Sequence, residues 1–170
     1  MHSVNPAMPW MSGVALLALL LLAGAVMHAD ITRRRIPNSF CASIAILGLI
    51  HALAQGGWSG FSDIGLRVGV AALIGIPLAL LFALRALGGG DVKLLLALVL
   101  WVEPEHLPAL FAITVLAGGI IAIGITIMRR VFCFRGPDGI PYGLAIVIAG
   151  LVVILPDVEA SAAAVCTHMI

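Results

Sequence analysis

The chain has 170 residues, of which 62% are hydrophobic and 10% are charged, and its formal net charge is +1 at pH 7. An ordinary soluble domain carries about 25% charged residues, so this composition excludes a soluble globular protein and indicates an integral membrane protein. A net charge so close to zero says nothing about partners, and no nucleic acid is expected among them.

Six apolar runs follow one another along the chain, separated by turn residues. Continuous runs of Ala, Gly and Leu favour helices over barrel strands, which would alternate polar and apolar residues. We therefore predict an all-α, polytopic membrane protein with six transmembrane helices. It is expected to form a single membrane-embedded core over residues 1–170, with a short polar and Ala-rich tail at 156–170. The predicted spans are Pro9–Ala29, Phe40–Ala54, Ile64–Leu87, Val92–Val102, Leu107–Met128 and Ile140–Leu155.

Basic residues gather in every second connection. Three arginines at 33–35 follow the first run, Arg85 and Lys93 flank the turn between the third and fourth, and residues 129–135 hold three more arginines. Lys and Arg favour cytoplasmic loops. These three connections are therefore expected in the cytoplasm, and both termini outside.

An aspartate ends the first run. Asp30 is followed by the basic segment and then by Ile36-Pro37-Asn38. A carboxylate at the edge of the hydrocarbon is costly to desolvate unless it has a use, which favours a functional group. The alternative is a structural ion pair with Arg33 or Arg34, one helical turn onward.

A second aspartate, Asp91, begins the fourth run directly after Gly88, Gly89 and Gly90. Eleven residues of helix rise only about 16 Å, against about 30 Å of hydrocarbon, so Asp91 is expected to be drawn below the inner surface. The glycines can adopt backbone angles closed to other residues and admit another backbone closely. An extended peptide substrate can lie there. The alternative is a tight turn in which Asp91 caps the next helix.

Lys93 follows two residues after Asp91 and is also a candidate substrate-binding residue. It either neutralises the aspartates between turnovers or anchors the helix at lipid headgroups. Under the predicted topology Asp30 and Asp91 fall on the same side of the membrane. Two carboxylates held close differ in proton affinity, so one can activate water while the other donates a proton.

No metal or cofactor is expected. Cys41, Cys133 and Cys166 are scattered, without a Cys-x-x-Cys pair, and the five histidines are dispersed. Two rival function classes remain. A small proton-coupled transporter would place its carboxylates near the membrane midplane, and a noncatalytic assembly factor of a secretion system would need neither aspartate.

Three motifs together resemble those of the type IV prepilin peptidases. Residues 30–38 resemble the first catalytic motif, residues 88–93 match Gly-x-Gly-Asp-x-Lys, and Pro141-Tyr142-Gly143 is similar to a third recurrent feature. The resemblance covers essentially the whole chain and is closest to the short peptidases of tight-adherence (Flp) pilus systems. Gly-x-Gly-Asp also occurs in presenilin-like enzymes, whose first aspartate has a Tyr-Asp setting unlike His28-Ala29-Asp30.

The resemblance implies an aspartic endopeptidase that removes the basic leader from prepilin or pseudopilin precursors at the cytoplasmic face of the bacterial inner membrane. Asp30 and Asp91 take the two catalytic positions. Longer members carry a cytoplasmic insert associated with N-methylation, and no such insert follows the first run here, so methyl transfer is not predicted.

The expected partners are the precursor and the lipid bilayer, and no oligomeric state is predicted. Asp30, Asp138 or the lipid surface would receive the basic leader. The precursor's apolar helix would lie against the bundle, where small residues permit close packing, as at Gly118, Gly119 and Gly124.

Overall fold

The computed structural model describes residues 9–33, 36–56, 60–131 and 142–168, and the side chains of residues 13–33, 36–53, 64–130 and 142–156. Over these residues the chain is helical and contains no strand, which confirms the predicted all-α class for this part. The elements are α1 (Pro9–Arg33), α2 (Asn38–Gly56), α3 (Gly60–Ala83), α4 (Gly89–Val99), the 3-10 helix η1 (Pro104–His106), α5 (Leu107–Val131) and α6 (Tyr142–His168).

Each predicted apolar run coincides largely with one helix, but only the starts at Pro9 and Leu107 match the prediction to the residue. Three of the differing boundaries are the most informative. Helix α1 continues past Ala29 to Arg33, so Asp30 is helical. Helix α4 begins at Gly89, so two of the three glycines and Asp91 lie in its first turn. Helix α6 runs on through Pro156 to His168, so most of the expected tail continues the helix.

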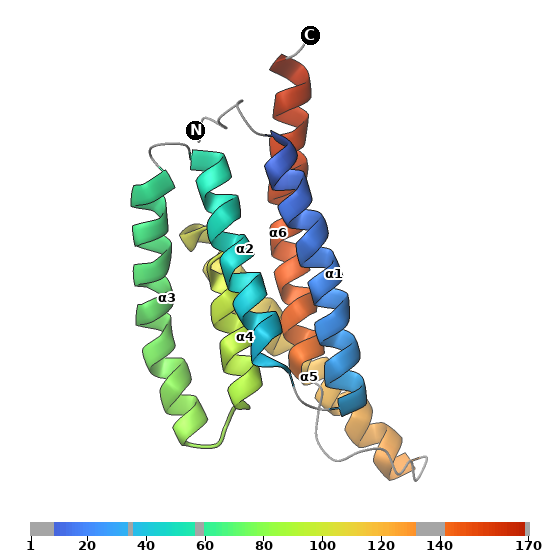
Figure 1. Cartoon of the computed structure of the whole chain (residues 1–170). Coiled ribbons are helices and arrows are strands. Elements are labelled where there is room, and N and C mark those ends of the chain that lie inside the picture. Colours follow the sequence, from blue (N-terminus) through green and yellow to red (C-terminus); the bar gives the residue numbers. More distant parts are fainter. Residues whose placement is uncertain (1–8, 34–35, 57–59, 132–141, 169–170) are drawn as a thin grey trace.

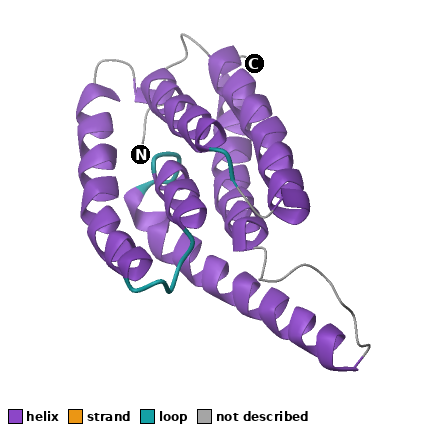
Figure 2. Cartoon of the chain, turned by 60° about the horizontal axis from the view of Figure 1, so that its bottom comes forward, coloured by secondary structure: helices purple, strands orange, loops and turns teal. Residues whose placement is uncertain are grey.

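Successive helices run in opposite directions (Figure 1), so the start of α1 and the end of α6 lie at the same end of the bundle. The opposite end receives the C-terminal ends of α1, α3 and α5 and the starts of α2, α4 and α6. We call it the basic end. It carries Arg33, Arg85, Lys93, Arg129 and Arg130. Helix α5 extends past the other helices on this side, as both views show (Figures 1 and 2).

The short helix α4 lies at the centre, in contact with α2, α3 and α6. Most of its side chains are buried, and glycines on the flanking helices let them approach. A Cβ atom at Gly150 of α6 would lie 2.8 Å from Leu98 Cδ1, and one at Gly48 of α2 would lie 2.7 Å from the Trp101 ring. Small residues at helix contacts are typical of membrane bundles. This packing fixes the position of the helix that carries Asp91.

The outer helices expose apolar side chains over their length. Leu73 and Ile76 of α3 are 68% and 70% exposed, and Val115 and Ile120 of α5 are 72% and 71% exposed. A continuous apolar exterior suits lipid rather than water. Stretches of three helices are long and apolar enough to cross a membrane, at Gly13–Arg33, Ile64–Ala83 and Pro104–Arg130. Shorter apolar stretches occupy Asn38–Leu53 and Tyr142–Pro156, so length and hydropathy support three of the six predicted spans.

Candidate active site

Asp30 is buried near the C-terminal end of α1, with 6% of its surface exposed. The backbone N–H of Leu144, in the first turn of α6, donates a hydrogen bond to Asp30 Oδ2 at 3.3 Å. The first turn of a helix has backbone N–H groups without intrahelical partners, so α6 offers Asp30 a donor that needs an acceptor. This contact joins Asp30 of the first predicted motif to the residue that directly follows the third.

Gly143 makes this contact possible. A Cβ atom at this position would lie 2.8 Å from Asp30 Oδ2 and 2.9 Å from Ile36 Cδ1. Such distances are far inside van der Waals contact. Any larger residue would therefore displace the carboxylate, the isoleucine or the start of α6.

Asp91 is the third residue of α4, and Gly88 is the residue that caps this helix. A Cβ atom at Gly88 would lie 2.7 Å from Asp91 Oδ2, so the carboxylate folds back over the cap. A backbone hydrogen bond from Gly88 reaches it there. Asp91 thus contributes to capping from inside the helix, in the manner of the third residue of a capping box, and not as the capping residue itself.

The three glycines face three different neighbours. Gly88 faces the Asp91 carboxylate, Gly89 lies under the Phe82 ring with a Cβ distance of 3.1 Å, and Gly90 lies against Ile36 Cβ at 3.3 Å. The cap Gly88 has φ −71° and ψ 143°, which other residues also adopt. Close side-chain contact, more than unusual backbone angles, is therefore the structural requirement for these glycines.

Ile36 links the surroundings of the two aspartates. Its side chain touches Gly90 of α4 on one side and Gly143 of α6 on the other. Asp91 follows Gly90 directly, and Asp30 lies against Gly143. The structure thus brings both candidate aspartates to the basic end, on either side of one isoleucine from the segment between α1 and α2.

The electrostatics of Asp91 reflect this arrangement. Asp91 precedes the apolar run of α4. Burial, and secondly the Asp30 carboxylate, raise the pKa of Asp91 to about 6, against the opposing effect of the Gly88 hydrogen bond. A like charge nearby disfavours the ionised form. Asp91 consequently holds a proton at a pH where an ordinary aspartate is ionised.

Lys93 is exposed and turned toward α2. Its Nζ donates a hydrogen bond to Asn38 Oδ1 at 2.9 Å, which joins the end of the first motif to the end of the second. This partner favours a role at the protein surface beside the aspartates over direct neutralisation of them. Asn38 ends the quoted Ile36-Pro37-Asn38 segment, and its pairing with Lys93 was not predicted.

One group of potential metal ligands occurs among the described residues. Glu103, Glu105 and His106 lie close together beyond the C-terminal end of α4. They are partly or fully exposed, and exposed acidic groups commonly occur without an ion. They lie at the far end of α4 from Asp91 and take no part in the site.

Known proteins match the part of the chain that carries the two aspartates. The type IV leader peptidase family matches residues 15–123, a segment that covers more than half of the chain and includes both aspartates and the three glycines. The chain belongs to the type IV leader peptidase family.

Curated members of the leader peptidase family show the same relationship. The chain is 31% identical over 160 residues to the "Prepilin leader peptidase/N-methyltransferase" of Aeromonas salmonicida, and equally to that of Aeromonas hydrophila. It is 31% identical over 155 residues to the Escherichia coli "Type 4 prepilin-like proteins leader peptide-processing enzyme". These alignments cover about 90% of this chain but 54% of each relative, so the chain spans about half their length. No solved structure matches.

Three residues of the site escaped the sequence prediction: Ile36, Gly143 and Leu144. The first two lie in segments that the family resemblance singled out, but no rule of spacing brings Gly143 to Asp30, 113 residues earlier, or Ile36 to Gly90 and Gly143. Several predicted residues lie outside the described part of the structure, namely Arg34, Arg35, Arg135, Asp138 and Pro141, as do the side chains of Cys133 and Cys166.

Proposed function

We propose that this leader peptidase family member is an aspartic endopeptidase that cleaves the basic leader from type IV prepilin precursors. The observation that carries the proposal is the placement of Asp30 and Asp91 around Ile36 at one end of the bundle. The relatives include proteins named as prepilin leader peptidases, which supports the substrate class. Flp-like prepilins are the first substrates to test, given the resemblance to the short tight-adherence peptidases.

The proposed chemistry uses the two carboxyl groups in different protonation states. Asp30, as carboxylate, takes a proton from water while the water oxygen attacks the scissile carbonyl carbon. Asp91, whose pKa is raised to about 6, donates its proton to the carbonyl oxygen. As the resulting diol collapses, the Asp91 carboxylate takes back a proton from a diol hydroxyl, the C–N bond breaks, and the leaving nitrogen takes the proton that Asp30 received from water. Such proton transfers contribute about 10²–10⁴-fold to a rate.

We propose that the site works at the cytoplasmic face of the inner membrane. Arg33, Arg85 and Lys93 accompany the aspartates at the basic end, and basic residues favour the cytoplasmic side. The basic leader would then stay in water while the apolar part of the precursor remains in the bilayer.

The transporter alternative receives less support from the geometry. Asp30 lies in the last turns of α1 and Asp91 in the first turn of α4. A coupling site in a transporter typically lies near the midplane, on interrupted helices. Carboxylates at helix ends fit a substrate that arrives from the aqueous side.

Cleavage of a purified Flp-like prepilin tests the proposal. Asp30→Asn and Asp91→Asn keep the side-chain shape but remove the titratable proton, and each is expected to lower the rate at least about 100-fold. Glu103→Gln, at the other end of α4, is the matched control and should cleave at the wild-type rate. Undiminished cleavage by either aspartate variant would refute the paired mechanism.

A further inference from the structure

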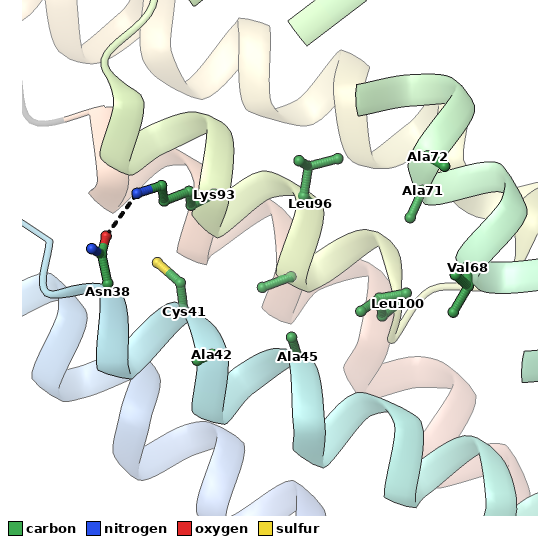
Figure 3. Close-up of a pocket in the computed structure, with 11 residues that line it drawn as sticks. Asn38, Cys41, Ala42, Ala45, Val68, Ala71, Ala72, Lys93, Leu96 and Leu100 are labelled. Atoms are coloured by element: carbon green, nitrogen blue, oxygen red, sulfur yellow. Dashed lines mark hydrogen bonds between the residues drawn. The ribbon is translucent and has the colours of Figure 1, made fainter. Parts of the chain in front are cut away.

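A groove opens between α2, α3 and α4 beside the candidate active site (Figure 3). Its volume is about 640 Å³. All three helices contribute small side chains to its walls, and these alanines are Ala42, Ala45, Ala71, Ala72 and Ala97. Small residues let helix backbones approach closely. The groove can therefore accept another helix, and the described residues of this chain do not fill it.

The groove has a polar end and an apolar end. Asn38 and Lys93 lie at the polar end, joined by their 2.9 Å hydrogen bond, while Val68 and Leu100 line the other (Figure 3). From Lys93 to Leu100 helix α4 rises about 10 Å. The groove therefore follows about two turns of α4 from the basic end into the apolar part of the bundle.

The polar end lies beside the site of the two aspartates. Cys41, which lines the groove, is close enough to Asp91 and Lys93 for both charges to act on it. Asn38 lies two residues after Ile36, which touches Gly90. Residues two apart on a helix point to different faces, so a chain whose peptide bond reaches Asp91 would pass around the first turn of α4 to enter the groove beside Lys93.

We propose that the groove receives the apolar helix of the prepilin precursor, the segment that follows the scissile bond. This proposal rests on the proposed peptidase function and names where the mature part of the substrate lies. The helix packs its side chains between the alanines of α2, α3 and α4. Its extended start lies at the polar end, where the Lys93 ammonium can donate to backbone carbonyls, since an ammonium has three donors and Asn38 accepts one.

The glycines of α5 fit this role less well. Gly118 is already covered, because a Cβ atom there would lie 2.9 Å from the Tyr142 ring. Gly119 and Gly124 have nothing within 4 Å, but they line no part of this groove. The groove itself lies on α2, α3 and α4.

Filling the groove tests the proposal. Ala42→Leu with Ala72→Leu adds two bulky side chains at exposed lining positions. With a full prepilin as substrate, kcat/KM is expected to fall about tenfold, mainly through KM, which corresponds to about 1.4 kcal/mol of lost binding. With a soluble peptide that holds the leader and cleavage site but no apolar helix, kcat/KM should not change.

The matched control is Ala79→Leu with Ala112→Leu, two exposed positions on α3 and α5 outside the groove, which should leave both substrates unaffected. Unchanged prepilin cleavage by the filled variant, or an equal loss with the short peptide, overturns the groove proposal. If the wild-type protein cleaves neither substrate, the peptidase function itself fails, so the two failures are distinguishable.

Photo-crosslinking supplies a second measurement. A benzophenone side chain at position 72, in an Asp91→Asn background that retains the substrate, is expected to crosslink the apolar helix of the prepilin. The same group at position 79 should not. Crosslinks from position 72 to lipid alone or to a second copy of this chain would assign the groove to that occupant and overturn the proposal.

Discussion

The Asp30 carboxylate and Gly143 are in direct contact across the α1–α6 interface: a Cβ atom at Gly143 would lie 2.8 Å from Asp30 Oδ2 and 3.0 Å from its Cγ. The glycine is therefore part of the wall that positions this carboxylate. The neighbouring Leu144 N–H completes the contact as a donor. Helix α6 thus holds one of the two proposed catalytic groups without supplying either.

Gly143→Ala is predicted to lower prepilin cleavage at least about 100-fold, because the added methyl group pushes the Asp30 carboxylate away from its position and small misplacements of catalytic groups are costly. The measurement is kcat/KM with a purified precursor. Gly124→Ala is the control, since nothing lies within 4 Å of a Cβ atom there. Wild-type cleavage by Gly143→Ala would show that the contact has no catalytic importance.

The order of helices and the shared end of the two aspartates could be predicted from the sequence, because apolar runs, glycine turns and the alternation of arginines are local signals. The contacts that build the site are not local. Asp30 meets Gly143, and Ile36 meets both Gly90 and Gly143, through helix packing that depends on side-chain shape across the whole bundle.

The role of the triple glycine could not be predicted from the sequence either. The sequence predicts a need for backbone freedom, whereas in the structure close contacts with Asp91, Phe82 and Ile36 explain why glycine stands at these positions. The positive φ in this region falls on Arg85, at 58°, a residue that local propensity would not assign to it. The groove of α2, α3 and α4 escaped prediction because it needs three helices to be placed.

The rate of cleavage is predicted to fall as the pH rises through about 6. The pKa of Asp91 is raised to about 6, so its carboxyl group holds the proton it donates below this pH and loses it above. The measurement is kcat/KM between pH 4.5 and 8.5 in one detergent. A rate that instead increases through this range would assign Asp91 the role of base, which would contradict the proposed roles of Asp30 as base and Asp91 as acid.

Asp91→Asn is predicted to stabilise the protein at pH 7.5. A folded-state pKa above the ordinary value of 3.8 means that stability is lost as the pH rises from about 4 to about 6, where the folded state must give up its proton. The variant avoids this loss. The midpoint of thermal unfolding should rise by about 2–4 °C, the shift that about 1 kcal/mol produces in a chain of this size.

At pH 4 the same comparison between Asp91→Asn and wild type should give a much smaller difference, because Asp91 is then protonated in the folded state. Glu103→Gln controls for the removal of a carboxylate from the other end of α4. An equal stabilisation by Asp91→Asn at both pH values would contradict the assigned shift.

Arg85→Gly is predicted to raise the midpoint of thermal unfolding by about 2–4 °C. The N–H groups of Arg85 and Ala86 donate to the Phe82 and Leu81 carbonyls, both at 2.9 Å, which is the hydrogen-bond pattern of a Schellman motif with Arg85 at its left-handed position. A side chain there costs about 1 kcal/mol relative to glycine. Arg85→Lys retains the strain, so its midpoint of thermal unfolding should equal that of the wild type. A lower midpoint for Arg85→Gly would mean that the arginine side chain stabilises the turn by more than this strain.

Arg67→Met is predicted to destabilise the protein by about 1–3 kcal/mol. One guanidinium nitrogen of Arg67, on α3, donates to the carbonyls of Leu100 and Trp101 at 3.2 Å and 3.0 Å. These carbonyls lie at the C-terminal end of α4, where a helix has acceptors without intrahelical partners and favours a positive charge. These hydrogen bonds give Arg67, a basic residue that lies away from the basic end, a structural role.

Thermal unfolding in detergent measures this effect, and Arg130→Met, an exposed change at the end of α5, is the control. Arg67→Lys keeps the charge but not the planar fork of donors, so its loss should be intermediate. Because α4 carries Asp91 at its other end, Arg67→Met should also lower prepilin cleavage, and Arg67→Lys should recover part of it. An unfolding midpoint for Arg67→Met equal to that of Arg130→Met would show that the two hydrogen bonds contribute nothing to holding α4 in place.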